Sequence, residues 1–98
     1  MTQFKDLDPV LHSQLRLAIV SLLMSVEEAD FSYLKDQTGA TSGNLSIQIS
    51  KLKEAGYIEV IKKFRNNYPL TLCHLTPTGK KRFIDYVASL NEYLKPGK

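Results

Sequence analysis

The sequence predicts a mainly helical α+β fold, with a three-helix core, a two-stranded hairpin and a long carboxy-terminal helix. Apolar residues recur at helical spacing on both sides of Gly39, which indicates two helices joined by a short turn. A run of strand-forming residues follows at 57–64, and a second run follows at 70–75. The length of 98 residues suits one hydrophobic core, so we expect residues 1–98 to form a single domain.

The first helix is expected to include His12 and to carry a wide apolar face. This face consists of Leu11, Leu15, Ala18, Ile19, Leu22 and Leu23. In these surroundings His12 suits packing or hydrogen bonding better than catalysis. The apolar run at 17–24 is interrupted by Ser21 and is far shorter than the roughly 20 residues of a membrane-spanning helix. Residues 1–6 also lack the apolar segment of a signal peptide, so we expect a cytoplasmic protein without a membrane partner.

The second and third helices are expected to meet across a turn of about three residues. The apolar positions that mark them are Phe31 and Leu34 before the turn and Leu45, Ile49 and Leu52 after it. Gly39 suits a left-handed position at the end of the second helix, and Thr41 or Ser42 can cap the start of the third. Such a short glycine connection is typical of the helix-turn-helix motif.

The two strands are expected to form a hairpin with a basic tip. The third helix ends at Gly56 and the first strand follows directly. Residues 65–69 form the expected connection to the return strand at 70–75. The two asparagines in this connection tolerate positive φ, and Pro69 suits the start of an edge strand.

The last helix is expected to begin at Thr76-Pro77, an N-cap followed by proline at the first helical position, and to run through Leu94. At 1.5 Å per residue it would be roughly 27 Å long, which is long for so small a domain. Its apolar stripe contains Phe83, Val87, Leu90 and Leu94, flanked by Tyr86 and Tyr93. A symmetric partner is the simplest cover for this stripe. The residues expected in a homodimer interface are Leu11, Leu15, Tyr86, Val87, Leu90, Tyr93 and Leu94.

Short motifs along nearly the whole chain occur in an order and spacing that resemble one family. The motifs are Asp8-Pro9, His12 and Leu15-Arg16-Leu17 in the first helix, Asp30-Phe31-Ser32-Tyr33-Leu34 in the second, Gly43-Asn44-Leu45-Ser46 and Glu54-Ala55-Gly56-Tyr57-Ile58 around the third, Lys62-Lys63-Phe64-Arg65 in the hairpin, and Leu75-Thr76-Pro77-Thr78-Gly79 after it. Together they resemble the compact winged-helix transcriptional regulators related to the multiple-antibiotic-resistance (MarR-type) repressors. This resemblance implies a winged helix-turn-helix fold that binds double-stranded DNA, with terminal helices that build a homodimer.

The charge of the chain is unevenly distributed, although the net charge is only +3. Residues 1–50 contain three Lys or Arg and six Asp or Glu, whereas residues 51–82 contain eight and two. The basic excess therefore begins inside the third helix and covers the hairpin. A charged run is often only a solvated face, but this one coincides with the elements expected to contact phosphate.

The exposed face of the third helix is expected to contact the major groove. Its candidate residues are Ser42, Gly43, Asn44, Ser46, Ile47, Ser50 and Lys51. Small side chains allow the helix backbone to approach DNA, Asn44 can bond adenine, and Ile47 can touch a thymine methyl group. The serines can bond bases or phosphate, and Lys51 is expected to meet phosphate.

The hairpin supplies a second set of DNA-contact candidates, namely Lys62, Lys63, Arg65 and Asn66. Arg65 is the best candidate for the minor groove or a backbone clamp, because a guanidinium bonds phosphate in two places and suits a narrow groove. The alternative is that the lysines only protect a solvated strand edge from aggregation.

No catalytic, metal or cofactor site is expected. The single cysteine, Cys73, is adjacent to His74 in a strand, so the two side chains point to opposite faces and do not share a metal. Cys73 shares its face with Leu75, which favours a buried structural role. The alternative function is a winged helix that binds other proteins without contacting DNA. The target DNA sequence, the direction of regulation and any small-molecule effector are not predicted.

Overall fold

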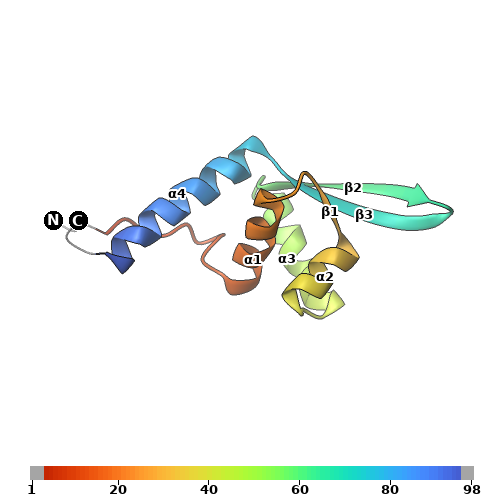
Figure 1. Cartoon of the computed structure of the whole chain (residues 1–98), viewed down its shortest axis with the longest axis horizontal. Helices are drawn as coiled ribbons and strands as arrows, with labels where there is room; N and C mark the ends of the chain where they lie inside the picture. Colours follow the sequence, from red (N-terminus) through yellow and green to blue (C-terminus); the bar gives the residue numbers. More distant parts are fainter. Residues whose placement is uncertain (1–3, 96–98) are drawn as a thin grey trace.

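The structure, a computed structural model, describes residues 4–95 and is a mainly helical α+β fold. Its elements are α1 (Gln14–Met24), β1 (Ala29–Asp30), α2 (Phe31–Thr38), α3 (Ser42–Glu54), β2 (Ile58–Arg65), β3 (Tyr68–Leu75) and α4 (Pro77–Leu94). The helices α1, α2 and α3 pack together in the middle of an elongated molecule of 57 × 25 × 21 Å. The β2–β3 hairpin, called the wing from here on, extends from one side and α4 from the other (Figure 1). The fold class predicted from the sequence is confirmed.

The helix-turn-helix forms because both ends of the turn have local partners. Asp30 caps α2 with its side chain. Gly39 has a φ of 71°, and its N–H donates to the carbonyl of Lys35, 2.9 Å away. The Thr41 hydroxyl accepts a hydrogen bond from the backbone N–H of Asn44 at 3.2 Å. These contacts stabilise the last turn of α2 and the first turn of α3, as the sequence predicted.

The sheet has a third strand that was not predicted from the sequence. The strand order is β1-β3-β2, and all pairs are antiparallel. In β1, Ala29 pairs with Cys73 and Asp30 pairs with Leu72. A strand of two residues contains no alternation that periodicity could detect. Its position is decided by pairing with a strand more than 40 residues away in sequence, so β1 also ties the start of α2 to the sheet.

The wing turn is shorter than the expected connection at 65–69. Arg65 already pairs with Tyr68, so Tyr68 and Pro69 belong to β3. The turn contains only Asn66 and Asn67, with φ values of 51° and 67°. Two consecutive positive φ values match the twist of the flanking strands and allow pairing up to the turn. Pro69 is tolerated because its nitrogen lies on the open side of β3, since β1 pairs only further along that strand.

The first helix begins later than the sequence suggested. It starts at Gln14, and residues 8–13 form turns instead. The Asp8 carboxylate accepts from the backbone N–H of Val10 at 2.8 Å, which is the short side-chain turn that aspartate favours over helix. His12 therefore lies outside the helix, and its Nδ1 is 3.0 Å from the Tyr86 hydroxyl oxygen. The hydrogen-bonding role expected for His12 is confirmed.

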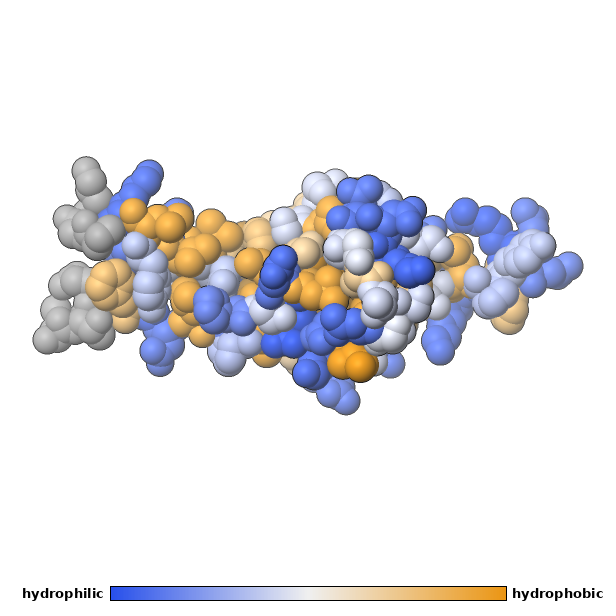
Figure 2. Space-filling view, turned by 90° about the horizontal axis from the view of Figure 1, so that it is seen from below, coloured by the Kyte–Doolittle hydropathy of each residue, from blue (hydrophilic) through white to orange (hydrophobic). Residues whose placement is uncertain are grey.

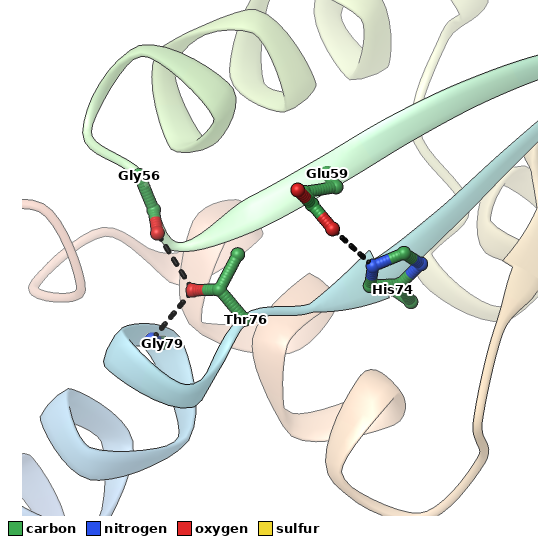
Figure 3. A network of polar contacts seen from close by, with 5 residues as sticks. All are labelled: Gly56, Glu59, His74, Thr76 and Gly79. Atoms are coloured by element: carbon green, nitrogen blue, oxygen red, sulfur yellow. Dashed lines mark hydrogen bonds and ion pairs between the residues drawn. The ribbon is translucent and has the colours of Figure 1, made fainter.

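The start of α4 is tied to the end of α3 through one threonine. The Thr76 hydroxyl accepts from the N–H of Gly79 at 3.0 Å and donates to the carbonyl of Gly56 at 2.6 Å (Figure 3). The predicted N-cap with proline in the first turn is therefore confirmed. In the same view, His74 and Glu59 bridge β3 and β2, with 2.6 Å between Nε2 and Oε1.

The core is continuous from α1 to the root of the wing. Its largest fully buried side chains are Leu11, Ile19, Val20, Leu23, Leu34, Leu45, Leu52, Ile58 and Cys73. Cys73 lies on the inner face of β3, and burial raises the pKa of its thiol to about 11. The buried structural position that its alternation with Leu75 predicted is confirmed.

We predict that Cys73→Val changes stability by less than about 1.5 kcal/mol, because the two side chains differ little in volume and both are apolar. The raised thiol pKa stabilises the wild-type fold below pH 9, and this contribution is lost as the pH rises through about 11. Urea denaturation at pH 8 and at pH 11 measures both effects. The variant should lose less stability between these pH values than the wild type, and an equal loss in both proteins would contradict the assignment.

Candidate nucleic-acid interface

The helix α3 buries one face and exposes the other, as its periodicity predicted. Leu45, Ile49 and Leu52 are at most 6% exposed. Every recognition candidate lies on the exposed side: Ser42, Gly43, Asn44, Ser46, Ile47, Ser50 and Lys51. Ile47 is 55% exposed, so this apolar side chain has no role in the core. The face is therefore small and polar around a single aliphatic side chain.

Gly43 is exposed in the first turn of α3 and is not required there by the fold. A Cβ atom at this position would meet nothing within 4 Å, and its φ is not in the left-handed region. Glycine in a helix costs roughly 0.8–1 kcal/mol relative to alanine. The only advantage that the geometry offers is a backbone that another molecule can approach closely.

A series of side-chain hydrogen bonds connects Arg16 to the exposed face of α3. This series was not predicted from the sequence. The Arg16 guanidinium donates from Nη1 to Gln48 Oε1 at 2.6 Å, and Gln48 Nε2 donates to Asn44 Oδ1 at 3.0 Å. The second contact joins residues one helical turn apart and could have been found from their spacing. The first contact crosses 32 positions of sequence, and no local pattern indicates it.

The wing candidates Lys62, Lys63, Arg65 and Asn66 are all exposed. Two aromatic residues, which were not among the candidates from the sequence, accompany them at the tip. Phe64 is 78% exposed and Tyr68 is 75% exposed. Because Arg65 pairs with Tyr68, a cation and an aromatic ring share one face of the hairpin. The wing tip lies far from the core, so no other part of the described chain covers these rings. The alternation of apolar and polar residues along a strand does not show how far each residue lies from the core.

A groove of about 410 Å³ lies between α3 and the wing. Its polar lining comes from both elements: Ser46, Ser50 and Lys53 from α3, and Lys62 and Thr71 from the wing. Phe31, Ile49 and Val60 form its apolar part. Lys53 was not among the sequence candidates, although it lies one residue beyond Leu52 on the exposed side of α3. The groove is lined by two lysines and three hydroxyl-bearing residues, and these residue types are usual protein partners of phosphate oxygens.

The residues expected in a homodimer interface divide into two groups. Leu11 is fully buried within the chain, and Tyr86 is 5% exposed and hydrogen-bonded to His12. These two offer almost no surface to a partner, because residues 8–13 fold back onto α4 and the core. Leu15 and Leu90 are half-buried, whereas Val87, Tyr93 and Leu94 are 39%, 42% and 68% exposed.

The exposed apolar side chains of α4 form one stripe, to which the structure adds Ile84 at 59% exposure. Figure 2 shows hydrophobic residues gathered over the half of the molecule that contains α4, and hydrophilic residues over the end of the wing. Near the end of α4, the ring centroid of Tyr93 lies 4.9 Å from that of Phe4 with the rings tilted by 41°, and the Tyr93 hydroxyl donates to the carbonyl of Lys5. The amino-terminal segment therefore lies along α4 beside this stripe.

Two further observations concern only residues 4–95. None of their helices has the length and the apolar character needed to cross a membrane. No three His, Cys, Asp or Glu side chains in this part of the chain lie close enough together to hold a metal ion.

Comparisons with known proteins agree with this fold. The family described as winged helix DNA-binding domain matches residues 15–94. An uncharacterized protein of Methanocaldococcus jannaschii is 30% identical over 86 residues, which cover 88% of this chain and 94% of that protein. The structure of a transcriptional regulator homologue from Pyrococcus horikoshii superposes with a TM-score of 0.81 at 26% identity, covering 87% of this chain and 84% of that one.

The fold extends to more distant structures. The transcriptional regulator BldR of Sulfolobus solfataricus has a TM-score of 0.72 at 18% identity, covering 84% of this chain and 58% of that one. At this identity the likeness shows the fold alone. Together with the family match, these structures confirm the resemblance to winged-helix transcriptional regulators that the sequence motifs indicated.

Proposed function

Because this chain belongs to the winged helix DNA-binding domain family, we propose that it regulates transcription as a homodimer on double-stranded DNA. In this proposal residues 1–98 act as one domain, α3 enters the major groove, and the wing lies on the phosphate backbone or in the minor groove. The terminal segments hold the two copies together. No catalytic step or cofactor is needed for this activity.

The observation that carries the proposal is the groove between α3 and the wing. Two of its lining residues, Lys53 and Lys62, are basic and come from different elements, and Ser50 and Thr71 line the same space. One DNA strand passing through this groove would have its phosphates neutralised and hydrogen-bonded from both sides. The exposed face of α3 and the wing tip would then lie on the two sides of that strand.

The two contact surfaces have different chemistry, which supports different roles. The wing offers Lys62, Lys63 and Arg65, and positive charge attracts the phosphates of any sequence. The α3 face offers Asn44, Ser46 and Ile47, whose amide, hydroxyl and methyl groups can distinguish base edges in the major groove. Affinity would therefore come mainly from the wing, and sequence preference mainly from α3.

The uncovered rings of Phe64 and Tyr68 favour a second candidate function, in which the wing tip docks on another protein. The two candidates differ in their response to salt. DNA binding weakens steeply and linearly on a logarithmic scale as salt rises, because counterions are released from the duplex. Docking through aromatic rings lacks this dependence, so titration of duplex DNA at several salt concentrations separates them.

We predict that Arg65→Ala and Lys63→Ala weaken binding to cognate and scrambled duplexes alike. Removal of one phosphate contact should reduce the slope of log K against log salt by about 0.9. Asn44→Ala should instead leave the slope nearly unchanged and reduce discrimination between bases by about 1–3 kcal/mol if it removes a bidentate hydrogen bond. Fluorescence anisotropy on both duplexes at four salt concentrations measures these quantities.

Lys95→Ala is the matched control for the wing variants, since Lys95 is also exposed but lies at the far end of α4. It should leave both the salt slope and the affinity unchanged. An unchanged slope for Arg65→Ala together with unchanged base discrimination for Asn44→Ala would refute the proposed docking of α3 and the wing.

A further inference from the structure

Hydrogen bonds connect the turn before α1 to the exposed face of α3. Arg16 Nε donates to the carbonyl of Val10 at 2.7 Å, and Nη1 of the same guanidinium donates to Gln48 Oε1 at 2.6 Å. Gln48 Nε2 then donates to Asn44 Oδ1 at 3.0 Å. Arg16 and Gln48 are half-buried, whereas Asn44 is exposed. The chain of hydrogen bonds therefore begins against the body of the protein and ends at its surface.

The direction of every hydrogen bond in this chain follows from the chemistry of Arg16. A guanidinium has five donors, no acceptor and a permanent charge. Only the amide oxygen of Gln48 can face it, so the amide nitrogen of Gln48 points toward Asn44. An amide nitrogen only donates, and Asn44 must therefore turn its oxygen toward Gln48. Among the described residues the Asn44 side-chain nitrogen has no partner, and its two N–H groups remain available.

We propose that Arg16, acting through Gln48, sets the orientation of the Asn44 amide, so that Asn44 offers DNA a hydrogen-bond donor rather than an acceptor. This inference rests on the proposed insertion of α3 into the major groove. Arg16 and Gln48 are positioning residues, because their effect on a base passes through Asn44. Sequence preference at one position of the site is thereby controlled by a residue of α1.

The chemistry of base edges turns this orientation into a base preference. In the major groove, guanine presents two acceptors and thymine presents one, whereas cytosine presents only a donor. Adenine presents an acceptor and a donor, and pairing with both requires the amide oxygen as well as the nitrogen. Because Gln48 occupies one of the two lone pairs of the Asn44 oxygen while both N–H groups of Asn44 are free, a base edge that presents only acceptors, guanine or thymine, is favoured at this position. We therefore expect guanine or thymine here in place of the adenine considered from the sequence.

Gln48→Glu provides a direct test, because a carboxylate only accepts hydrogen bonds. The introduced carboxylate would still accept from Arg16, but it could bond Asn44 only through the Asn44 nitrogen. The Asn44 amide would rotate and present its oxygen to DNA. The preference at the contacted base should then shift from guanine or thymine toward adenine or cytosine, by about tenfold for a well-formed contact.

The base contacted by Asn44 is identified first. Duplexes are selected from a random pool with the wild type and with Asn44→Ala, and the contacted base is the position at which the alanine variant loses its base preference. Gln37→Glu is the charge control, since Gln37 is an exposed α2 residue outside the hydrogen-bonded chain. It introduces the same charge and should leave the base preference unchanged. Gln48→Met removes both hydrogen bonds and should relax the preference without inverting it.

An unchanged preference in Gln48→Glu, or a wild-type preference for adenine or cytosine at this base, overturns the inference. If Gln48→Glu binds no duplex, Gln48→Met decides the question, and an unchanged preference in that variant overturns it as well.

Hydrogen exchange of the side-chain amides, followed by NMR in the free protein, tests the orientation without DNA. One Gln48 Nε2 proton should be protected, whereas both Asn44 Nδ2 protons should exchange freely. Protection of an Asn44 proton instead overturns the inference. A wild-type protein that shows the expected exchange pattern but binds no duplex would refute the proposed function and leave the orientation standing.

Discussion

Gly79→Ala is expected to destabilise the protein by about 3 kcal/mol, at the upper end of the range for overpacked sites. Gly79 is buried in the first turn of α4. A Cβ atom there would lie 2.1 Å from the carbonyl oxygen of Tyr57 and 3.0 Å from its carbonyl carbon. These are backbone atoms, so no side-chain rotation relieves the clash. The Tyr57 carbonyl is also held by the backbone N–H of Thr76 at 3.1 Å, and the whole start of α4 would have to move.

Urea denaturation followed by circular dichroism measures this loss. Gly43→Ala is the matched control, because the same substitution in α3 meets nothing within 4 Å. That variant should be as stable as the wild type or more stable by up to about 1 kcal/mol, since alanine is the better helix former. Equal stabilities for Gly79→Ala and the wild type would show that α4 does not dock on Tyr57 as described.

The parts of this fold that were predictable from sequence are those decided by neighbouring residues. The caps formed by Thr41 and Thr76 and the turn at Gly39 involve partners within four positions. Short polar side chains and glycine have few alternatives at such places. The exposed face of α3 was predictable for a related reason, because the buried stripe from Leu45 to Leu52 leaves only one side for solvent.

The parts that were not predictable depend on partners distant in sequence. Strand β1 forms because Ala29 pairs with Cys73. A segment of two residues has no sequence pattern that predicts such a pairing. Leu11 has helical spacing to Leu15, which extended the expected first helix too far, whereas Asp8 forms a turn with Val10. Periodicity counts apolar positions but does not show whether the chain folds back over them.

The same reason explains why the expected dimer interface mixes residues that are buried in the single chain with residues that are exposed. The apolar stripe of α4 is wide, and spacing alone does not separate the part that covers the core from the part that is exposed. Tyr86 and Leu90 pack in the core of the single chain, whereas Val87 and Leu94 are exposed and lie outside that core. The distinction follows from how residues 4–13 and α1 lie against α4, which is a property of the tertiary structure.

The double variant Val87→Asp/Leu94→Asp is expected to be a folded monomer that binds a two-fold DNA site about 100-fold or more weakly than the wild type. Both side chains are exposed in the single chain, at 39% and 68%, so the substitutions do not disturb the core. In the proposed homodimer they would bury unpaired carboxylates in an apolar contact, which is strongly unfavourable. A monomer engages one half-site at a time and loses the avidity of roughly 10²–10⁴ that linked sites provide.

These residues give a cleaner test than Leu90→Asp, because Leu90 also packs against the core of its own chain. A loss of folding in that variant would be indistinguishable from a loss of dimerisation. Sedimentation at micromolar concentration measures the oligomeric state, and anisotropy with full-site and half-site duplexes measures binding. The wild type should sediment as two chains and prefer the full site, whereas the double variant should bind both duplexes equally weakly.

Thr78→Asp is the control, because Thr78 is exposed in the first turn of α4. It precedes Val87 by nine positions, which is about 180° around the helix, so the introduced carboxylate would face away from Val87 and Leu94. This variant should remain a dimer with the full-site affinity of the wild type. A wild-type protein that sediments as one chain, or a double variant that remains a dimer, would remove the α4 stripe from the proposed interface. In the second case the half-buried face of α1 around Leu15 would be the surface left to join the two copies.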